Sequence, residues 1–308
     1  MRLFAVTLMV IVSTTSLARK VDIRYADTAI IKSHLQNIIN TEKPRHFNNP
    51  DVLNKVSAYI FKHFKTHCDT VFYQNYKVDN NTYRNVVARI GPKGTPKIVV
   101  GAHYDVCGEQ DGADDNASGV VGLLELVRLL SADTLPNQIE FVAYTLEEPP
   151  YFRTPYMGSH IHAKSIYESQ EDILGMICLE MIGYFSDERK SQNYPLGILK
   201  MIYGGKGDYI TIVQKFKGGE FSRKFKRRIK RQNRVKTKSF KGPAKLQGID
   251  FSDHLNYWKY EFSAVMVTNT GFYRNKNYHQ ITDTIETLDL NRMALVIDQV
   301  YMVLKQWK

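Results

Sequence analysis

Strand-like apolar segments alternate with helix-like segments along most of this chain, and that alternation constrains its fold more than any other feature. The segments with strand character cover residues 97–105, 139–148, 173–184, 209–216 and 263–270. The first of them, KIVVGAHYD, is almost continuously apolar, as expected of a strand that is buried on both faces. Strand–helix alternation of this kind predicts an α/β fold with a largely parallel central sheet.

Helical periodicity separates and flanks these strands. Apolar spacing predicts helices over 28–40, 50–66 and 157–168, another directly after residue 119, one within 220–232 and a closing helix from residue 290. The helix at 50 begins with Asn49 as N-cap and Pro50 at the first helical position, a combination that favours a helix start. Segments 70–78 and 82–90 resemble a pair of strands.

Residues 1–18 have the composition of a secretory signal peptide. Arg2 provides the positive start, residues 3–12 are apolar, and residues 16–18 (SLA) form a small-x-small cleavage site. The apolar stretch is shorter than a membrane span, so an uncleaved anchor is the less favoured alternative. We therefore expect an exported protein, periplasmic or secreted, whose mature chain (residues 19–308) forms a single domain and is a monomer.

Three cysteines are too few to hold the fold together. Cys68, Cys107 and Cys178 allow at most one disulfide and leave one thiol over. Their spacing also matches no zinc-binding motif. The core must therefore come from the apolar segments.

Positive charge is concentrated late in the chain. The formal net charge is +11, and residues 215–245 contain fourteen Lys or Arg residues against a single acid, Glu220. Phe221, Phe225 and Ile229 recur every four residues there, which predicts an amphipathic helix with one apolar stripe. Two interpretations stay open: a solvated surface helix, or a weak docking face for anionic surfaces. No nucleic-acid motif accompanies the segment, so nucleic acid is not an expected partner.

The segment GADDNASG, residues 112–119, places Asp114 and Asp115 side by side. Like charges this close disfavour each other unless a positive charge lies nearby. In one interpretation the segment only caps the next helix, with Asn116 or Ser118 as N-cap and the acids complementing the helix dipole. In the other, one aspartate binds a cation. The choice depends on which other residues join it.

Acidic residues and histidines recur where the predicted strands end. His103 and Asp105 close one strand, Glu147 and Glu148 another, and Glu180 lies near the end of a third. The loop NYHQITDT after the last strand adds a histidine at 279 and an aspartate at 283. Because the carboxyl ends of parallel strands meet at one edge of a sheet, these groups are expected to converge. Imidazole and carboxylate ligands together suit a divalent ion, zinc first.

The chain also carries six segments that match a known family in order and spacing: VVGAHYD, GADDNASG, LEEPPYFRTPYMGS, LEMIGYFSD, FSDH and FYRNKNYHQITDTIETLD. They resemble the zinc exopeptidases of the bacterial leucyl-aminopeptidase type, a superfamily shared with glutamate carboxypeptidases and glutaminyl cyclases. The resemblance covers residues 84–300. It implies a single α/β domain, a mixed, mostly parallel twisted sheet of about eight strands flanked by helices, and two zinc ions that share a carboxylate.

The resemblance also implies a role for each residue of the site. Carried over by position, the metal ligands are His103, Asp115, Glu148, Glu180 and His279. Asp115 is the bridging carboxylate, Glu148 and His279 complete one site, and His103 and Glu180 complete the other. Glu147 is the implied general base, and Asp105 lies behind His103, where it fixes the imidazole. Asp114 is then a neighbour of the bridging carboxylate and not a ligand.

Glu180 is the one departure from the family pattern, where this position most often carries aspartate. The extra methylene moves the carboxylate unless the backbone compensates. We therefore expect one firmly held zinc and a weaker second site, with bidentate binding and exchange for another metal as alternatives.

The implied reaction is hydrolysis of the first peptide bond of substrates with a free N-terminus. A water that bridges the two ions is activated by Glu147, which then delivers the proton to the leaving amine. Tyr257, Tyr273 and His254 are candidates for stabilising the oxyanion. The expected function is that of an exported metal-dependent aminopeptidase. Two alternatives stay open: a single-zinc glutaminyl cyclase, although Tyr278 stands where cyclases carry tryptophan, and a non-catalytic binding relative.

Overall fold

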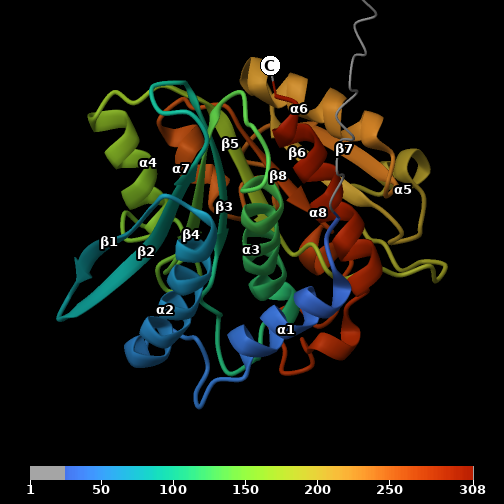
Figure 1. Cartoon of the computed structure of the whole chain (residues 1–308). Coiled ribbons are helices and arrows are strands. Elements are labelled where there is room, and N and C mark those ends of the chain that lie inside the picture. The colour runs from blue at the N-terminus through green and yellow to red at the C-terminus, as the bar shows by residue number, and fades with distance from the viewer. Residues whose placement is uncertain (1–24, 308) are drawn as a thin grey trace, which may run out of the picture.

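Eight strands form one mixed sheet at the centre of the molecule, described by a computed structural model over residues 25–307 (Figure 1). They are β1 (Thr70–Val78), β2 (Asn81–Ile90), β3 (Lys97–His103), β4 (Gln138–Tyr144), β5 (Ile173–Glu180), β6 (Ile210–Lys215), β7 (Thr237–Gly242) and β8 (Ala264–Thr268). Their spatial order is β1-β2-β4-β3-β5-β8-β6-β7. The central strands β4, β3, β5 and β8 are parallel, whereas β1, β2 and β6 pair antiparallel with their inner neighbours. The predicted α/β fold, a single domain with a mixed sheet of about eight strands, is confirmed.

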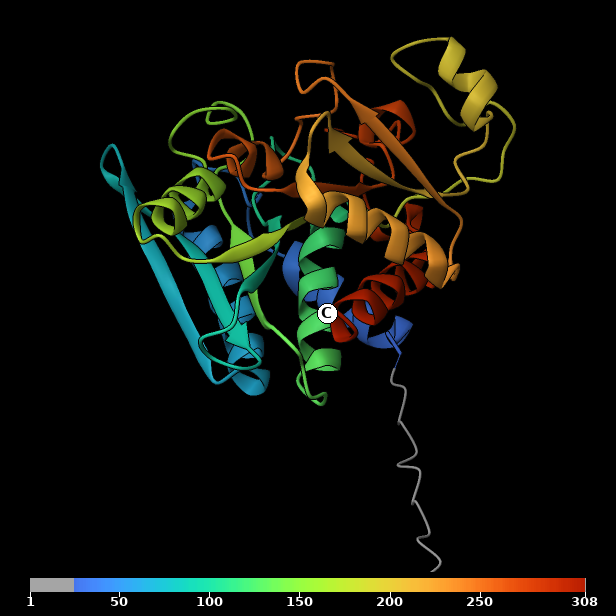
Figure 2. The ribbon, with the colours of Figure 1, turned by 90° about the horizontal axis from the view of Figure 1, so that it is seen from above.

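Helices cover both faces of this sheet (Figures 1 and 2). One face packs against α1 (Thr28–Ile39), α2 (Pro50–His67), α3 (Gly119–Leu130), α6 (Gly219–Gln232) and α8 (Leu290–Lys305), which share one apolar core. The other face packs against α4 (Gly158–Glu168) and α7 (His254–Lys259) in a second, smaller core. Every residue of β3 is buried, as predicted for a strand covered on both faces.

Three short elements were not expected from the sequence. The edge strand β7 carries two lysines within TKSFKG, so it lacks the apolar run of the central strands. The helices α5 (Ile198–Tyr203) and α7 are six residues each, which is too short for a clear helical period. In Figure 2, α5 lies on a loop at the periphery of the molecule.

The basic segment forms the amphipathic helix that its spacing predicts. Phe221, Phe225 and Ile229 of α6 are buried in the larger core. The basic side chains Arg223, Arg227, Lys230 and Arg231 lie on the exposed side. The apolar stripe thus attaches the helix to the domain, and its charged face is left to the solvent.

Three further expectations concern the leader, the membrane and the cysteines. The predicted signal peptide, residues 1–18, lies outside the described residues. Within residues 25–307, no helix combines the length and the apolar character needed to cross a membrane. Cys68, Cys107 and Cys178 are all free thiols, so the single disulfide that the sequence allowed does not form here.

Candidate metal centre

The carboxyl ends of the parallel strands bring the predicted residues to one edge of the sheet. They are His103 at the end of β3, Glu180 at the end of β5, Glu147 and Glu148 just beyond β4, Asp115 in the turn η1 (Ala113–Ser118) before α3, and His279 in the loop after β8. Five of the six are buried, and the side chain of His279 is 24% exposed. Segments far apart in the chain thus supply one compact polar cluster.

Asp115 lies between two groups of ligands and presents one carboxylate oxygen to each. Its Oδ1 is 3.5 Å from His103 Nε2, which is also 3.4 Å from Glu180 Oε2. Its Oδ2 is 3.3 Å from His279 Nε2, which is also 3.2 Å from Glu148 Oε2. A carboxylate with this arrangement can bridge two cations, one held by each group.

The chain turns sharply after β4, so that adjacent glutamates can face the same site. Leu146 has a φ of +59°, a left-handed conformation that non-glycine residues seldom adopt. The backbone N–H groups of Glu147 and Glu148 then both donate to the Asp105 carboxylate, at 3.2 and 3.1 Å. The predicted strand 139–148 therefore ends early, at Tyr144.

Asp105 lies behind His103, as the resemblance implies, but its carboxylate does more than face the imidazole. His103 Nδ1 is 3.2 Å from the Asp105 carbonyl oxygen and 3.6 Å from Oδ1 of its carboxylate. The same carboxylate accepts the two N–H groups of the glutamate pair. Asp105 thus ties the ends of β3 and β4 together beneath the site.

Asp114 points away from the cluster and joins three loops. Its Oδ1 accepts the backbone N–H groups of Gly183 and Tyr184, at 2.9 and 3.2 Å. Its Oδ2 accepts the side-chain amides of Asn269 and Asn275, at 2.7 and 2.8 Å. These donors replace water around a buried carboxylate, which explains how two aspartates can be adjacent.

Glu180 is held by two donors on the β5 side of the site. Ser252 Oγ donates to Glu180 Oε2 at 2.6 Å, and the Asn116 side-chain amide donates to the same oxygen at 3.2 Å. The next residue, Met181, has a φ of +50° and turns the chain away directly after the carboxylate. Backbone and donors together keep the longer side chain beside His103.

The electrostatics of the cluster favour bound cations. Burial raises the pKa of Glu147 well above its ordinary value, and the neighbouring Glu148 and Glu180 carboxylates add to the rise. Burial and the Asp115 carboxylate raise the pKa of Glu148 to about 7. Burial opposes protonation of His103, but Glu147 and Glu180 raise the pKa of that imidazole well above its usual range. So many buried acids in one place are stable only with nearby positive charge.

The residues fit a metal ion by the chemistry of their donors. Two imidazoles with several carboxylates are typical ligands of zinc. Glu148 Oε1 is buried and has no hydrogen-bond partner among the described residues, although buried polar atoms are seldom left without one. His279 Nε2 faces the Asp115 and Glu148 carboxylates at 3.3 and 3.2 Å without forming a hydrogen bond to either. His103, Asp115 and Glu180 offer ligand atoms that lie within 4.8 Å of one another. The donor sets on the two sides of Asp115 therefore each have the chemistry to hold a cation.

A cavity of about 370 Å³ opens beside the cluster. Its walls are mainly apolar and aromatic, with Phe152, Tyr209, Phe240, Phe251, Phe272 and Tyr273 among the lining residues. Of the three candidates for oxyanion stabilisation, only Tyr273 lines it. The other two make hydrogen bonds elsewhere: His254 Nε2 donates to the Ile249 carbonyl at 2.7 Å, and the Tyr257 hydroxyl is hydrogen-bonded to the Tyr144 hydroxyl.

Two residues of the site were missed by sequence reasoning. Asp253, from the FSDH segment, is fully buried, and burial raises its pKa to about 7, against the effect of the nearby His103. Cys107 lies beside Glu148 and His279, with ligand atoms that are within 4.8 Å of one another. Its position two residues after Asp105 was the available signal.

Comparisons with known proteins find similar sequences along most of the chain. A family model described as Peptidase family M28 matches residues 85–304. The uncharacterized protein YfbL of Escherichia coli K12 is 39% identical over 289 residues, which cover 91% of this chain and 88% of YfbL. Leucine aminopeptidase 1 of Uncinocarpus reesii is 27% identical over 225 residues, which cover 68% of this chain. The match spans only 51% of that aminopeptidase, about half its length.

Solved structures share the fold at low sequence identity. The LapA aminopeptidase of Legionella pneumophila has a TM-score of 0.70 at 19% identity, covering 90% of this chain and 71% of LapA. A glutaminyl cyclase of Bacteroides thetaiotaomicron has a TM-score of 0.70 at 17% identity, covering 93% and 100%. A Zn-dependent exopeptidase of Parabacteroides distasonis has a TM-score of 0.69 at 16% identity, covering 92% and 99%.

Proposed function

This chain belongs to peptidase family M28, and from that premise we propose that it is a zinc-dependent aminopeptidase. The observation that carries the proposal is the position of Asp115, with one oxygen toward His103 and Glu180 and the other toward His279 and Glu148. Such a site suits two zinc ions, which polarise a substrate carbonyl and lower the pKa of a water molecule when bound.

Glu147 is the residue proposed to move the proton. Its carboxylate is buried, lines the cavity and lies 3.7 Å from His103 Nε2, so it is beside the ligands. Burial raises its pKa above that of an exposed glutamate, the direction that suits a general base. It takes a proton from the attacking water and returns it to the leaving amine.

The cavity is proposed to bind the N-terminal side chain of the substrate. Its aromatic walls suit an apolar or aromatic residue, and its polar end carries Glu147, Glu148 and Glu180. Glu148 and Glu180 are proposed metal ligands, so Glu147 is the carboxylate left at that end to attract a cationic α-amine, a charge that an acylated N-terminus lacks. This arrangement supports removal of the first residue in preference to internal cleavage.

A glutaminyl cyclase-like reaction is the second candidate. The likeness to solved glutaminyl cyclases supports it through the fold alone. Tyr278 stacks on His279, with ring centroids 3.8 Å apart, at the position where the sequence departs from those enzymes. Hydrolysis is favoured because a buried glutamate pair and two ligand groups surround Asp115 here.

A panel of amino-acid arylamides tests the proposal. Leucyl and phenylalanyl arylamides should be hydrolysed, whereas their N-acetyl derivatives should be resistant. Glutaminyl-peptide should lose its first residue and not release ammonia. Ammonia release without arylamide hydrolysis would favour the cyclase, and neither activity in the zinc-loaded protein would contradict both.

We further propose that the protein is exported. The composition of residues 1–18 supports this, with its positive start, apolar centre and small-residue cleavage site. N-terminal sequencing of the protein recovered from the periplasm and the medium is the direct measurement. A mature chain that begins at Arg19 is expected, and an intact N-terminus in the cytoplasm would contradict it.

A further inference from the structure

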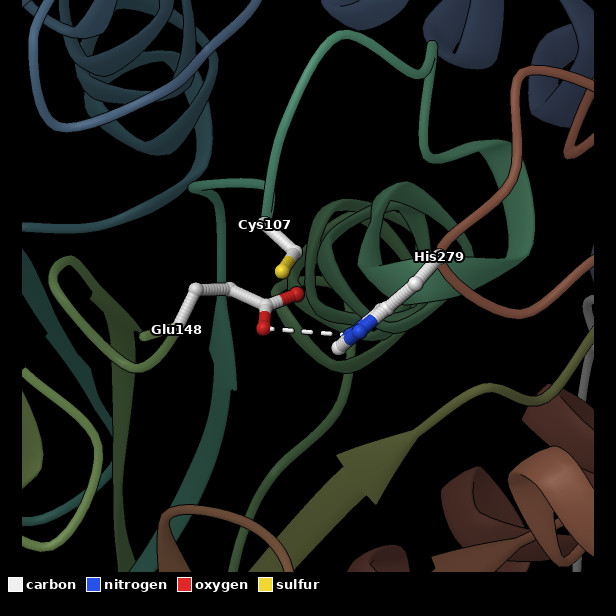
Figure 3. Close-up of side chains that lie close together, drawn as sticks. All are labelled: Cys107, Glu148 and His279. Atoms are coloured by element: carbon white, nitrogen blue, oxygen red, sulfur yellow. Dashed lines mark ion pairs between the residues drawn. The ribbon is translucent and has the colours of Figure 1, made fainter. Parts of the chain in front are cut away.

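We propose that Cys107 is a ligand of the metal ion that His279 and Glu148 hold. The proposal rests on the metal centre proposed above and adds one donor to it. Figure 3 shows the thiol, the carboxylate and the imidazole gathered around one small space. The Sγ atom, a carboxylate oxygen of Glu148 and a ring nitrogen of His279 all lie within 4.8 Å of one another.

The spacing of these three atoms suits a shared ion. Zinc binds nitrogen and oxygen at about 2.0–2.2 Å and sulfur at about 2.3 Å, which puts tetrahedral ligand atoms roughly 3.3–3.8 Å apart. Small side-chain rotations bring a group within 4.8 Å to that spacing. A second observation concerns Glu148, which is only 5% exposed. Its buried Oε1 has no hydrogen-bond partner in the described part of the chain.

The loop that carries Cys107 is fixed from below by Arg45. This side chain is 1% exposed and donates to the carbonyl oxygens of Tyr104, Asp111 and Gly112, at 2.9, 2.7 and 3.1 Å. The N–H of Val106 in turn donates to the Arg45 carbonyl at 3.1 Å. Asp105, two residues before Cys107, accepts a hydrogen bond from the backbone N–H of Glu148. Hydrogen bonds therefore hold the chain on both sides of Cys107.

A thiolate makes the two metal positions unequal. With Asp115, whose Oδ2 lies 3.3 Å from His279 Nε2, the group Cys107, Glu148 and His279 would supply four protein donors on one side, whereas Asp115, His103 and Glu180 would supply three on the other. Four protein donors are typical of a firmly held ion, and three leave a position for substrate or water. Sulfur also favours zinc and cadmium over manganese and magnesium at that side. Binding breaks the S–H bond and releases the proton to the solvent.

Cobalt substitution gives a readout that does not depend on activity. The metal-free protein is loaded with Co²⁺, and the near-ultraviolet absorption is recorded together with the cobalt content. A thiolate-to-cobalt charge-transfer band should appear in the parent and in the control Cys68→Ala, and it should be absent from Cys107→Ser. Cys68 is a suitable control because it is a free, buried thiol outside the cluster.

Alkylation of the parent protein provides a second measurement, which does not depend on whether a variant folds. Iodoacetamide should modify Cys107 in the metal-free protein, and zinc should slow that modification at least tenfold. Cys107→Ser should also weaken the tighter of two zinc-binding steps by at least about tenfold, as loss of a site residue does elsewhere. Bound cobalt without the band, or equal alkylation with and without zinc, would overturn the ligand and leave the aminopeptidase proposal intact. Failure to bind cobalt at all would overturn both.

Discussion

At this site, adjacent residues of the same type are assigned different roles. The clearest example is the glutamate pair, with Glu147 as general base and Glu148 as metal ligand. Glu148 lies 3.2 Å from His279 and Glu147 lies 3.7 Å from His103, both on the cavity wall. Glu148→Gln replaces an anionic oxygen with an amide, so metal content should fall. Glu147→Gln should keep the metal, while kcat drops by about 10²–10⁴ and KM changes little.

Elemental analysis and steady-state kinetics on both glutamate variants decide the assignment. The two substitutions are matched in size and charge, so each controls for the other. Metal loss in Glu147→Gln with metal retained in Glu148→Gln would mean that the two roles are reversed.

Substitution of the two adjacent aspartates should have different effects, with Asp114 acting on stability and Asp115 on metal binding. Asp114→Asn turns one of two accepting oxygens into a donor that faces the donors on Gly183 and Tyr184 or on Asn269 and Asn275. The metal-free variant should lose about 3 kcal/mol of unfolding free energy, because buried donors are left unpaired. Asp115→Asn should instead empty both metal positions. Urea unfolding and metal content measure the two effects, and an Asp114→Asn protein of parental stability would contradict the structural role.

At the scale of elements, the short helix α7 of the smaller core contributes a titrating group, His254, to stability. Burial lowers the pKa of His254, the first residue of α7, to about 4, and its Nε2–H donates to the Ile249 carbonyl. The unfolded chain binds this proton below pH 6.5 and the folded chain binds it only near pH 4. Because of this residue, the free energy of unfolding should therefore fall by about 1.4 kcal/mol for each unit by which the pH is lowered from 6.5 toward 4.

His254→Gln tests that slope. Glutamine keeps an N–H donor toward the same carbonyl but takes up no proton in this range. Urea unfolding at pH 7 and at pH 5 should show a smaller loss of stability in the variant than in the parent. Parallel losses in the two proteins would contradict the prediction.

The basic helix α6 is expected to act at the surface and not in the reaction. Replacing Arg223, Arg227, Lys230 and Arg231 with Gln should weaken binding to anionic vesicles, most clearly at low salt, where exposed charges are least screened. Turnover of a leucyl arylamide should stay within a few-fold. The matched control replaces Lys32, Lys43, Lys62 and Lys65, exposed lysines elsewhere, with the same change in net charge. Equal loss of vesicle binding in both variants would show that only net charge matters.

The sequence predicted the long elements well because their patterns are strong. The run KIVVGAH and the apolar stripe of α6 have regular patterns of apolar residues, and these residues are buried in the structure. The edge strand β7 and the short helices α5 and α7 depend on their neighbours, so local patterns do not reveal them. The ends of two strands were predicted too late, at residues 148 and 184. The chain turns earlier, at Leu146 and Met181, through left-handed conformations that these residue types do not predict.

At the scale of the whole molecule, convergence at the sheet edge followed from topology. Once the central strands are parallel, their carboxyl ends must meet, and the ligands with them. The resemblance to a family supplied the roles, and the chain alone supplied the residue types. The position of Cys107 close after Asp105 was visible in the sequence, but its role and the second function of Asp105 needed tertiary structure, since each depends on the distant Glu148.

Metal binding should couple the separate segments of the chain into one stable unit. The ligands come from four strand ends and the turn before α3, so an ion that binds only the folded state stabilises all of them together. Chelation should lower the melting temperature of the parent and have less effect on Asp115→Asn, which has little metal to lose. Equal shifts in both proteins would argue against binding at Asp115.

The most direct test of the central claim is hydrolysis of leucyl arylamide before and after complete removal of metal. The parent as purified should contain between one and two divalent ions per chain by elemental analysis. The metal-free protein should be inactive, and zinc, cobalt or manganese should restore activity to the parent while Glu147→Gln stays inactive with metal bound. Undiminished hydrolysis by protein shown to be free of metal would contradict the account.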